Sequence, residues 1–249
     1  PDALLRTIVG PLGPFWSLAV EEQFYLLISG AVLIVSLTTR PVRNLAILVA
    51  IGWLLSTAVQ LFADWPQYRM EFGTEVRAAE LLAGSALAIV LHRRPDLPTR
   101  LGSQLQPLGV IALTVVIALA ATTDYDPPWL LRGGYAALSI VNAVLVISLL
   151  CAGPLTRTLS WSPAVAVGRL SYSWYLVHWP VILVLTPART GLDTWALRGA
   201  KIVVSLLVAV VLHRVVEQPL RLLEPPMRLV VATWLGVSLI VATTALVVL

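Results

Sequence analysis

Long apolar stretches, separated by short polar segments, recur along the whole chain. A helix that crosses a bilayer needs about 20 consecutive, mostly apolar residues. Runs close to this length cover residues 16–39, 45–63, 75–92, 106–122, 132–151, 170–187, 196–216 and 229–249. Pro, Gly and Arg cluster in the gaps between the runs. The pattern predicts an all-α fold, a polytopic integral membrane helical bundle with about eight transmembrane helices.

The composition also indicates a membrane protein. Hydrophobic residues make up 58% of the chain and charged residues only 12%, whereas soluble domains contain about 25% charged residues. The only cysteine, Cys151, excludes an intrachain disulfide, and we interpret it as a small buried side chain. The three histidines, at positions 92, 178 and 213, lack metal-ligand spacing, so no metal is expected.

The arginines are distributed unevenly between the loops, and this predicts the orientation of the chain. Positive charge in short loops marks the cytoplasmic side. The loops after the odd-numbered runs hold Arg40, Arg43, Arg93, Arg94, Arg100, Arg157, Arg169, Arg214, Arg221 and Arg228. The other loops hold Arg69, Arg132, Arg189 and Arg198, together with Asp64, Glu71, Asp124, Asp126 and Asp193. The odd loops are therefore predicted to be cytoplasmic. The net charge of +4 is explained by topology, with no nucleic-acid partner.

Two adjacent carboxylates, Glu21 and Glu22, interrupt the first apolar run. Ionisable groups inside a membrane usually face the bundle interior and mark functional sites. Ser17, Glu21 and Tyr25 share one helical face, whereas Glu22 points about 100° away. The alternative is an acid pair near the interface that snorkels or caps the helix.

Arg77 and Glu80 form a second candidate site, in the outer half of the third run. They are i, i+3 neighbours and can form an ion pair, with Glu75 and Arg69 close by. A guanidinium also offers a planar fork for a phosphate or a carboxylate. Substrate binding and a salt bridge at the headgroups both remain open.

Ser171, Tyr175 and His178 share one face of the sixth run. A histidine titrates near neutral pH and can move protons, although it can also serve as a hydrogen-bonded link between helices. Further along, Pro219 is expected to end the seventh helix, and Glu217 to form an ion-pair cluster with Arg214 and Arg221. Structural anchoring and contact with an anionic donor are both open for that cluster.

Four ordered segments resemble one protein family. They read FWSLAVEEQFYLL from Phe15, TEVRAAELLAGSALA from Thr74, GRLSYSWYLVHWPV from Gly168 and VEQPLR from Val216. Each is similar to a motif of the membrane acyltransferase 3 family, the O-acetylases of bacterial surface polysaccharides such as lipopolysaccharide. Four matches in the same order make a chance resemblance implausible.

The resemblance implies an O-acetyltransferase in the bacterial inner (plasma) membrane. Such an enzyme moves an acetyl or similar acyl group from cytoplasmic acetyl-CoA or another acyl-CoA to a hydroxyl of an extracytoplasmic cell-surface glycan. Glu21 and His178 would support catalysis, around a principal histidine expected upstream. The expected substrate contacts are Arg77, Glu80, Ser17, Tyr25, Ser171 and Tyr175.

The chain is expected to be an internal fragment, because it starts at Pro1 and lacks the upstream arginine and histidine motifs of the family. Residues 1–228 would form the latter part of the transmembrane domain, inactive by itself. Residues 229–249 would be an additional helix that runs outward to a fused SGNH-type domain. The alternatives are a transporter or flippase of envelope glycans, and a scaffold without catalytic activity. A transporter predicts repeat symmetry between the two halves of the chain, which the sequence does not show.

Overall fold

The computed structural model describes residues 15–123, 127–222 and 228. Every regular element in this part of the chain is helical, which confirms the all-α prediction. Two compact units divide the chain at residue 169, with Pro1–Arg169 as unit 1 and Leu170–Leu249 as unit 2. The helices of unit 1 are α2 (Phe15–Ser36), α3 (Pro41–Phe62), α4 (Gln67–Phe72), α5 (Thr74–Arg93), α6 (Leu97–Leu101), η2 (Gly102–Leu105), α7 (Gln106–Thr122), η3 (Leu130–Gly134), α8 (Tyr135–Leu150) and α9 (Pro154–Leu159). Helix α10 (Ser162–Val184) crosses the unit boundary, and unit 2 continues with α11 (Pro187–Thr190), α12 (Thr194–Leu212), η4 (His213–Glu217) and α13 (Gln218–Leu222).

Five helical segments of the described residues are long and apolar enough to cross a membrane. They are Phe15–Ser36, Pro41–Phe62, Leu97–Thr122, Leu130–Leu150 and Thr194–Leu222. The predicted runs 75–92 and 170–187 also lie in long helices, α5 and α10, but these contain more polar residues. The run 229–249 lies outside the described residues. The chain is thus a multi-pass membrane protein, and the number of eight spans stays a prediction.

Prolines and one aspartate mark several helix starts. Helix α3 begins at Pro41, and a proline also lies in the first turn of α7, where the missing N–H has no helical acceptor to lose. Helix α12 is capped by Asp193, whose Oδ1 accepts a hydrogen bond of 2.8 Å from the backbone N–H of Ala196. These local signals explain where α3, α7 and α12 begin.

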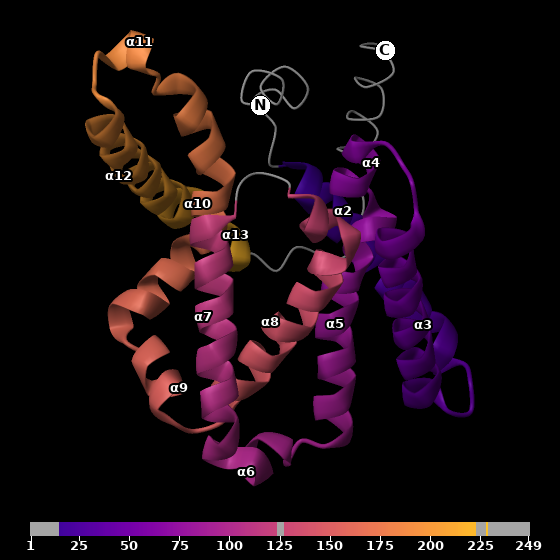
Figure 1. Ribbon diagram of the computed structural model, residues 1–249. Helices are drawn as coiled ribbons and strands as arrows, with labels where there is room; N and C mark the ends of the chain where they lie inside the picture. The colour runs from indigo at the N-terminus through magenta and orange to yellow at the C-terminus, as the bar shows by residue number, and fades with distance from the viewer. Residues whose placement is uncertain (1–14, 124–126, 223–227, 229–249) are drawn as a thin grey trace. The chain divides into compact units, whose positions relative to one another are not determined.

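Unit 1 is a layer of helices in which α5 contacts both α3 and α8, and α7 packs on α8 (Figure 1). Helix α2 contacts α3 and α5. Gly109 permits the close approach of α7 to α8, because a Cβ atom there would lie 2.5 Å from the Cβ of Ser148. A small buried cluster of Met70, Val76 and Leu131 packs at one end of the layer.

The buried side chain of Gln60 supplies a hydrogen-bond acceptor where the backbone before α8 is not helical. Arg132 and Gly133 have non-helical dihedral angles, with φ of +90° at Gly133, so the next turn loses regular acceptors. Gln60, from α3, supplies one: its Oε1 accepts from the backbone N–H of Ala136 at 3.1 Å. Its Nε2 donates to the carbonyl of Val76 at 2.7 Å, which links α3, α5 and α8.

A second glutamine, Gln106, fastens the turn after α8. Its Nε2 donates to the carbonyl oxygens of Ser148 at 2.8 Å and Cys151 at 3.2 Å, and its Oε1 accepts from the N–H of Leu155 at 2.9 Å. Gly153 leaves room for this side chain, since a Cβ there would lie 2.4 Å from Gln106. Cys151 is buried in this turn, with 1% exposure, as predicted.

Candidate functional site

Unit 1 contains a cavity of about 520 Å³. Its lining includes Trp16, Glu71, Arg77, Trp129, Tyr135 and Asn142, contributed by α2, α4, α5, the segment before η3, and α8. The cavity lies at the end of unit 1 where α2, α5 and α8 begin and where α7 ends. The arginine distribution predicts that this end is extracytoplasmic.

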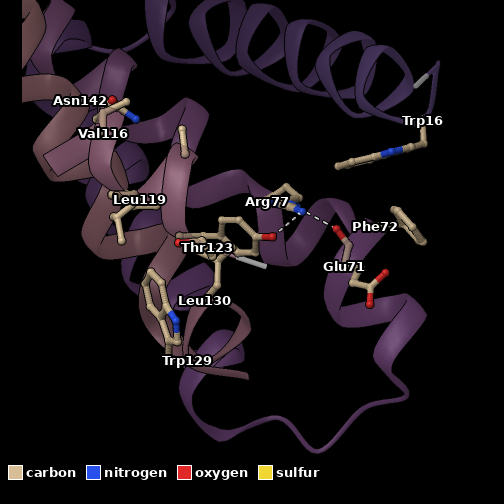
Figure 2. A pocket seen from close by; sticks show the side chains of 13 residues that line it. Trp16, Glu71, Phe72, Arg77, Val116, Leu119, Thr123, Trp129, Leu130 and Asn142 are labelled. Atoms are coloured by element: carbon tan, nitrogen blue, oxygen red, sulfur yellow. Dashed lines mark hydrogen bonds between the residues drawn. The ribbon is translucent and has the colours of Figure 1, made fainter. Parts of the chain in front are cut away.

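Arg77 is the most highly connected side chain of this cavity (Figure 2). Its Nε donates to the backbone carbonyl of Glu71 at 2.7 Å, and its Nη2 donates to the hydroxyl of Tyr135 at 2.9 Å. Its Nη1 donates to Oε1 of Glu80 at 3.1 Å. The guanidinium carbon also lies 3.6 Å from the ring centroid of Tyr135 and 5.1 Å from that of Trp16. All three nitrogens therefore have acceptors within the protein.

These contacts bear on the two alternatives for Arg77 and Glu80, substrate binding and a salt bridge. The predicted i, i+3 ion pair is present, with side-chain exposures of 13% for Arg77 and 40% for Glu80. Three of the five guanidinium N–H groups already donate to protein groups, one on each nitrogen, so Nη1 and Nη2 retain one N–H each. The geometry favours Arg77 as a residue that positions Tyr135 and the backbone of Glu71 beside the cavity.

The three candidates on α2 lie apart from this group. Glu21 is half-buried and Tyr25 is 54% exposed, and neither lines the cavity. Ser17 lies one turn before Glu21 on the same helix and is half-buried. Trp16 of this helix does line the cavity, and the hydroxyl of Thr74 donates to Oε1 of Gln23 at 2.8 Å. Helix α2 is thus attached to the cavity, although its predicted polar stripe faces elsewhere.

Unit 2 contains a second cavity, of about 330 Å³, between α10 and α12. Ser171, Tyr175 and His178 line it together, so the predicted shared face exists. Lys201 and Ser205 line it from α12, and the indole Nε1 of Trp174 donates to Oγ of Ser205 at 2.8 Å. Lys201 was not singled out in the sequence, although a lysine inside the apolar run 196–216 was a visible signal.

The hydrogen bond of His178 fixes its tautomer. Its Nδ1 lies 2.6 Å from the carbonyl oxygen of Tyr175, which can only accept, so Nδ1 carries the proton. The neutral ring then has a lone pair on Nε2.

Glu217 lies in a polar cluster that the sequence predicted only in part. The expected ion pair with Arg221 is present, with Nη2 at 2.7 Å from Oε1, although outside hydrogen-bond geometry. The other oxygen, Oε2, accepts from Oγ of Ser173 at 2.5 Å and from Nδ1 of His213 at 2.9 Å. Arg214 makes no ion pair with Glu217 among the described residues. The partners of Glu217 besides Arg221 are therefore Ser173 and His213, where the sequence predicted Arg214.

Sequence reasoning missed several residues of the first cavity. Tyr135 and Asn142 are separated by seven residues and share a face of α8, and Asn142 is a polar residue within an apolar run. The position of Asn142 could therefore have been recognised from the sequence. The contact between Arg77 and Tyr135 could not, because it joins positions 58 residues apart.

Long apolar helices around cavities that carry a few polar side chains define a polytopic membrane protein. Residues 3–214 match the acyltransferase 3 family, which is described as an acyltransferase domain. The chain belongs to this family, as the four motifs indicated.

Relatives of known name are similar over most of this chain. YrhL of Bacillus subtilis is 31% identical over 221 residues, which are 85% of this chain and 35% of that protein. The peptidoglycan O-acetyltransferase OatA of Listeria monocytogenes is 30% identical over the same shares, 85% and 35%. The O-acetyltransferase OatA of Staphylococcus aureus is 26% identical, over 88% of this chain and 38% of its own length. The chain therefore spans about a third of these relatives. No solved structure is significantly similar to it.

Proposed function

We propose that this protein is a membrane-bound O-acyltransferase that transfers an acetyl or similar acyl group to a hydroxyl of a cell-wall carbohydrate. The observation that carries the proposal is the family match over residues 3–214. The naming of two relatives as O-acetyltransferases, one of them acting on peptidoglycan, supports the same reaction and the same class of acceptor.

The reaction requires a hydroxyl to lose its proton and a thioester carbonyl to gain negative charge, away from bulk water. With Nδ1 of His178 bonded to the carbonyl of Tyr175, Nε2 is the ring atom left for proton transfer, and Glu21 offers a carboxylate within an apolar helix. We propose that both support catalysis. Ser17 and Tyr25 on α2, and Ser171 and Tyr175 on α10, are proposed to contact substrate or intermediates.

The proposed acyl donor is acetyl-CoA or another acyl-CoA at the cytoplasmic side. Arg40, Arg93 and Arg94 lie at the predicted cytoplasmic end of unit 1, and all three are exposed. Exposed guanidinium groups attract the phosphates of such a donor. In the predicted orientation, a donor at the cytoplasmic side would meet these arginines.

The direct test is chemical analysis of the cell wall. The full-length gene is deleted, and surface glycans are examined by mass spectrometry for base-labile acyl groups. These groups should disappear in the deletion strain and return on complementation. Unchanged acylation, with glycan precursors retained on the cytoplasmic side, would instead identify a transporter or flippase.

The predicted orientation is tested separately by cysteine labelling. Thr123 follows α7 and lines the first cavity, whereas Thr99 lies in α6 at the opposite end of unit 1. In the full-length protein with Cys151 replaced by serine, Thr123→Cys should react with a membrane-impermeant maleimide in intact cells. Thr99→Cys should react only after the membrane is permeabilised. The reverse pattern would overturn the orientation.

A further inference from the structure

The cavity of unit 1 has the size and the chemistry of a carbohydrate site. Its volume of about 520 Å³ lies within the roughly 300–1,000 Å³ of typical small-molecule sites. Trp16 and Trp129 line it from different elements, and Figure 2 shows them on either side of Arg77. Flat aromatic faces suit the apolar faces of sugar rings, and the polar groups around Arg77 suit hydroxyls.

Asn142 is the feature that has no structural explanation. It lies on α8 seven residues after Tyr135, which corresponds to about 10 Å further along the helix axis. Its side chain lines the cavity and is exposed, and its amide has no hydrogen-bond partner among the described residues. Polar side chains inside membrane helices normally face a partner, a water-filled cavity or a ligand. An unpaired amide at this depth indicates that the deep end of the cavity receives a polar group.

The other polar groups of the cavity are held in fixed positions. Arg77 hydrogen-bonds the hydroxyl of Tyr135 and the backbone carbonyl of Glu71, so both groups already have a partner. The carboxylate of Glu71 accepts a hydrogen bond of 2.6 Å from Gln67. Asn142 differs from these groups because both its amide N–H groups and its carbonyl remain available to a ligand.

We propose that this cavity is the binding site for the acceptor sugar, with Asn142 as a residue that contacts substrate and determines specificity. The proposal rests on the proposed function for the identity of the acceptor. The ring lies against Trp16 and Trp129, and the amide of Asn142 hydrogen-bonds a hydroxyl or N-acyl group of the ring. The site takes a pyranose ring, supplied either by the glycan polymer or by a lipid-linked precursor.

The test uses Asn142→Leu in the full-length protein, because leucine has a similar size and no hydrogen-bonding groups. Binding of a soluble disaccharide fragment of peptidoglycan is measured by calorimetry in nanodiscs. We expect the affinity to fall at least about tenfold. Ile140→Ala is the matched control, since Ile140 lies on α8, is 52% exposed and does not line the cavity.

Two further arms separate the possible outcomes. Asn142→Gln keeps the amide and should recover part of the affinity, which a purely structural role would not require. A lipid-linked disaccharide that binds through Asn142, when the soluble fragment does not, would identify the precursor as the ligand. Unchanged affinity of Asn142→Leu for both sugars would overturn the proposal, even if the protein acylates glycans. Binding that depends on Asn142, in a protein without acyltransferase activity, would retain the site and remove the proposed function.

Discussion

Two charged side chains of low exposure, Arg77 in unit 1 at 13% and Glu217 in unit 2 at 8%, lie in contrasting surroundings. Arg77 donates hydrogen bonds to the backbone carbonyl of Glu71 and the hydroxyl of Tyr135, and it lies over the ring of Tyr135. Its only carboxylate partner among the described residues is the half-exposed Glu80, and it lines a cavity. The carboxylate of Glu217 accepts hydrogen bonds from Ser173 and His213 and forms an ion pair with Arg221. It lines neither the cavity of unit 1 nor the cavity between α10 and α12. Both are costly to bury, yet only one lies beside space for a substrate. A buried charge in a membrane helix therefore has two uses, and the neighbouring cavity distinguishes them.

The strongest test of this contrast is Glu217→Ala. The hydroxyl of Ser173, which is fully buried, and Nδ1 of His213 would both lose their acceptor. An unsatisfied buried donor costs about 1–3 kcal/mol, so the loss of two acceptors should destabilise the full-length protein by roughly 2–6 kcal/mol. Thermal unfolding in detergent measures the effect. Glu217→Gln retains acceptor capacity and should lose less. A normal melting temperature with reduced acylation would place Glu217 in the functional class.

Arg77→Lys should have the next largest effect, on activity rather than on stability. Lysine retains the charge but cannot hold Glu71, Glu80 and Tyr135 together. Acylation by the full-length protein should fall at least about tenfold, which corresponds to 1.4 kcal/mol of transition-state or substrate binding. Turnover is measured at matched abundance. Near-normal turnover would show that Arg77 contributes to packing and not to activity.

Glu21 is an intermediate case, a half-buried acid in an apolar helix with no partner among the described residues. If an unpartnered charge indicates function, Glu21→Gln should reduce acylation several-fold and leave protein abundance unchanged. Glycan acylation and immunoblotting of the same cells provide the comparison. Equal losses of both would show that Glu21 is structural.

The smallest effect is expected for Glu80→Gln. The carboxylate is 40% exposed, and exposed ion pairs contribute about 0–1 kcal/mol. Acylation and melting temperature should both stay close to wild type, within about twofold for activity. A large loss would mean that Glu80, rather than Tyr135 or Glu71, is the partner that makes Arg77 important.

The helices could be predicted from sequence because hydropathy and proline positions are local signals. The runs 45–63 and 106–122 lie within a few residues of α3 and α7. The start of α10 was missed: it begins at Ser162 rather than at 170, although Pro163 in the first turn is a recognised start signal.

The site was predictable only where its residues share one helix. Ser171, Tyr175 and His178 follow helical spacing, and so do Arg77 and Glu80. Tyr135 beside Arg77, and Ser173 beside Glu217, depend on how distant helices pack, which periodicity does not encode. The role of Gln60 could not be predicted either, because its partner, the backbone N–H of Ala136, becomes available only through the irregular backbone before α8.

The hydrogen-bond partners of Gln106 are synthesised well after Gln106 itself. Its partners at Ser148, Cys151 and Leu155 are added 42 to 49 residues later. At about 5–20 residues per second, this interval lasts roughly 2–10 s. During that time the amide of Gln106 lacks its final hydrogen-bond partners. The pairing of α7 with α8 therefore becomes fixed only when the ribosome has passed the turn at Gly153, and a pause in translation before this point would prolong the unpaired state.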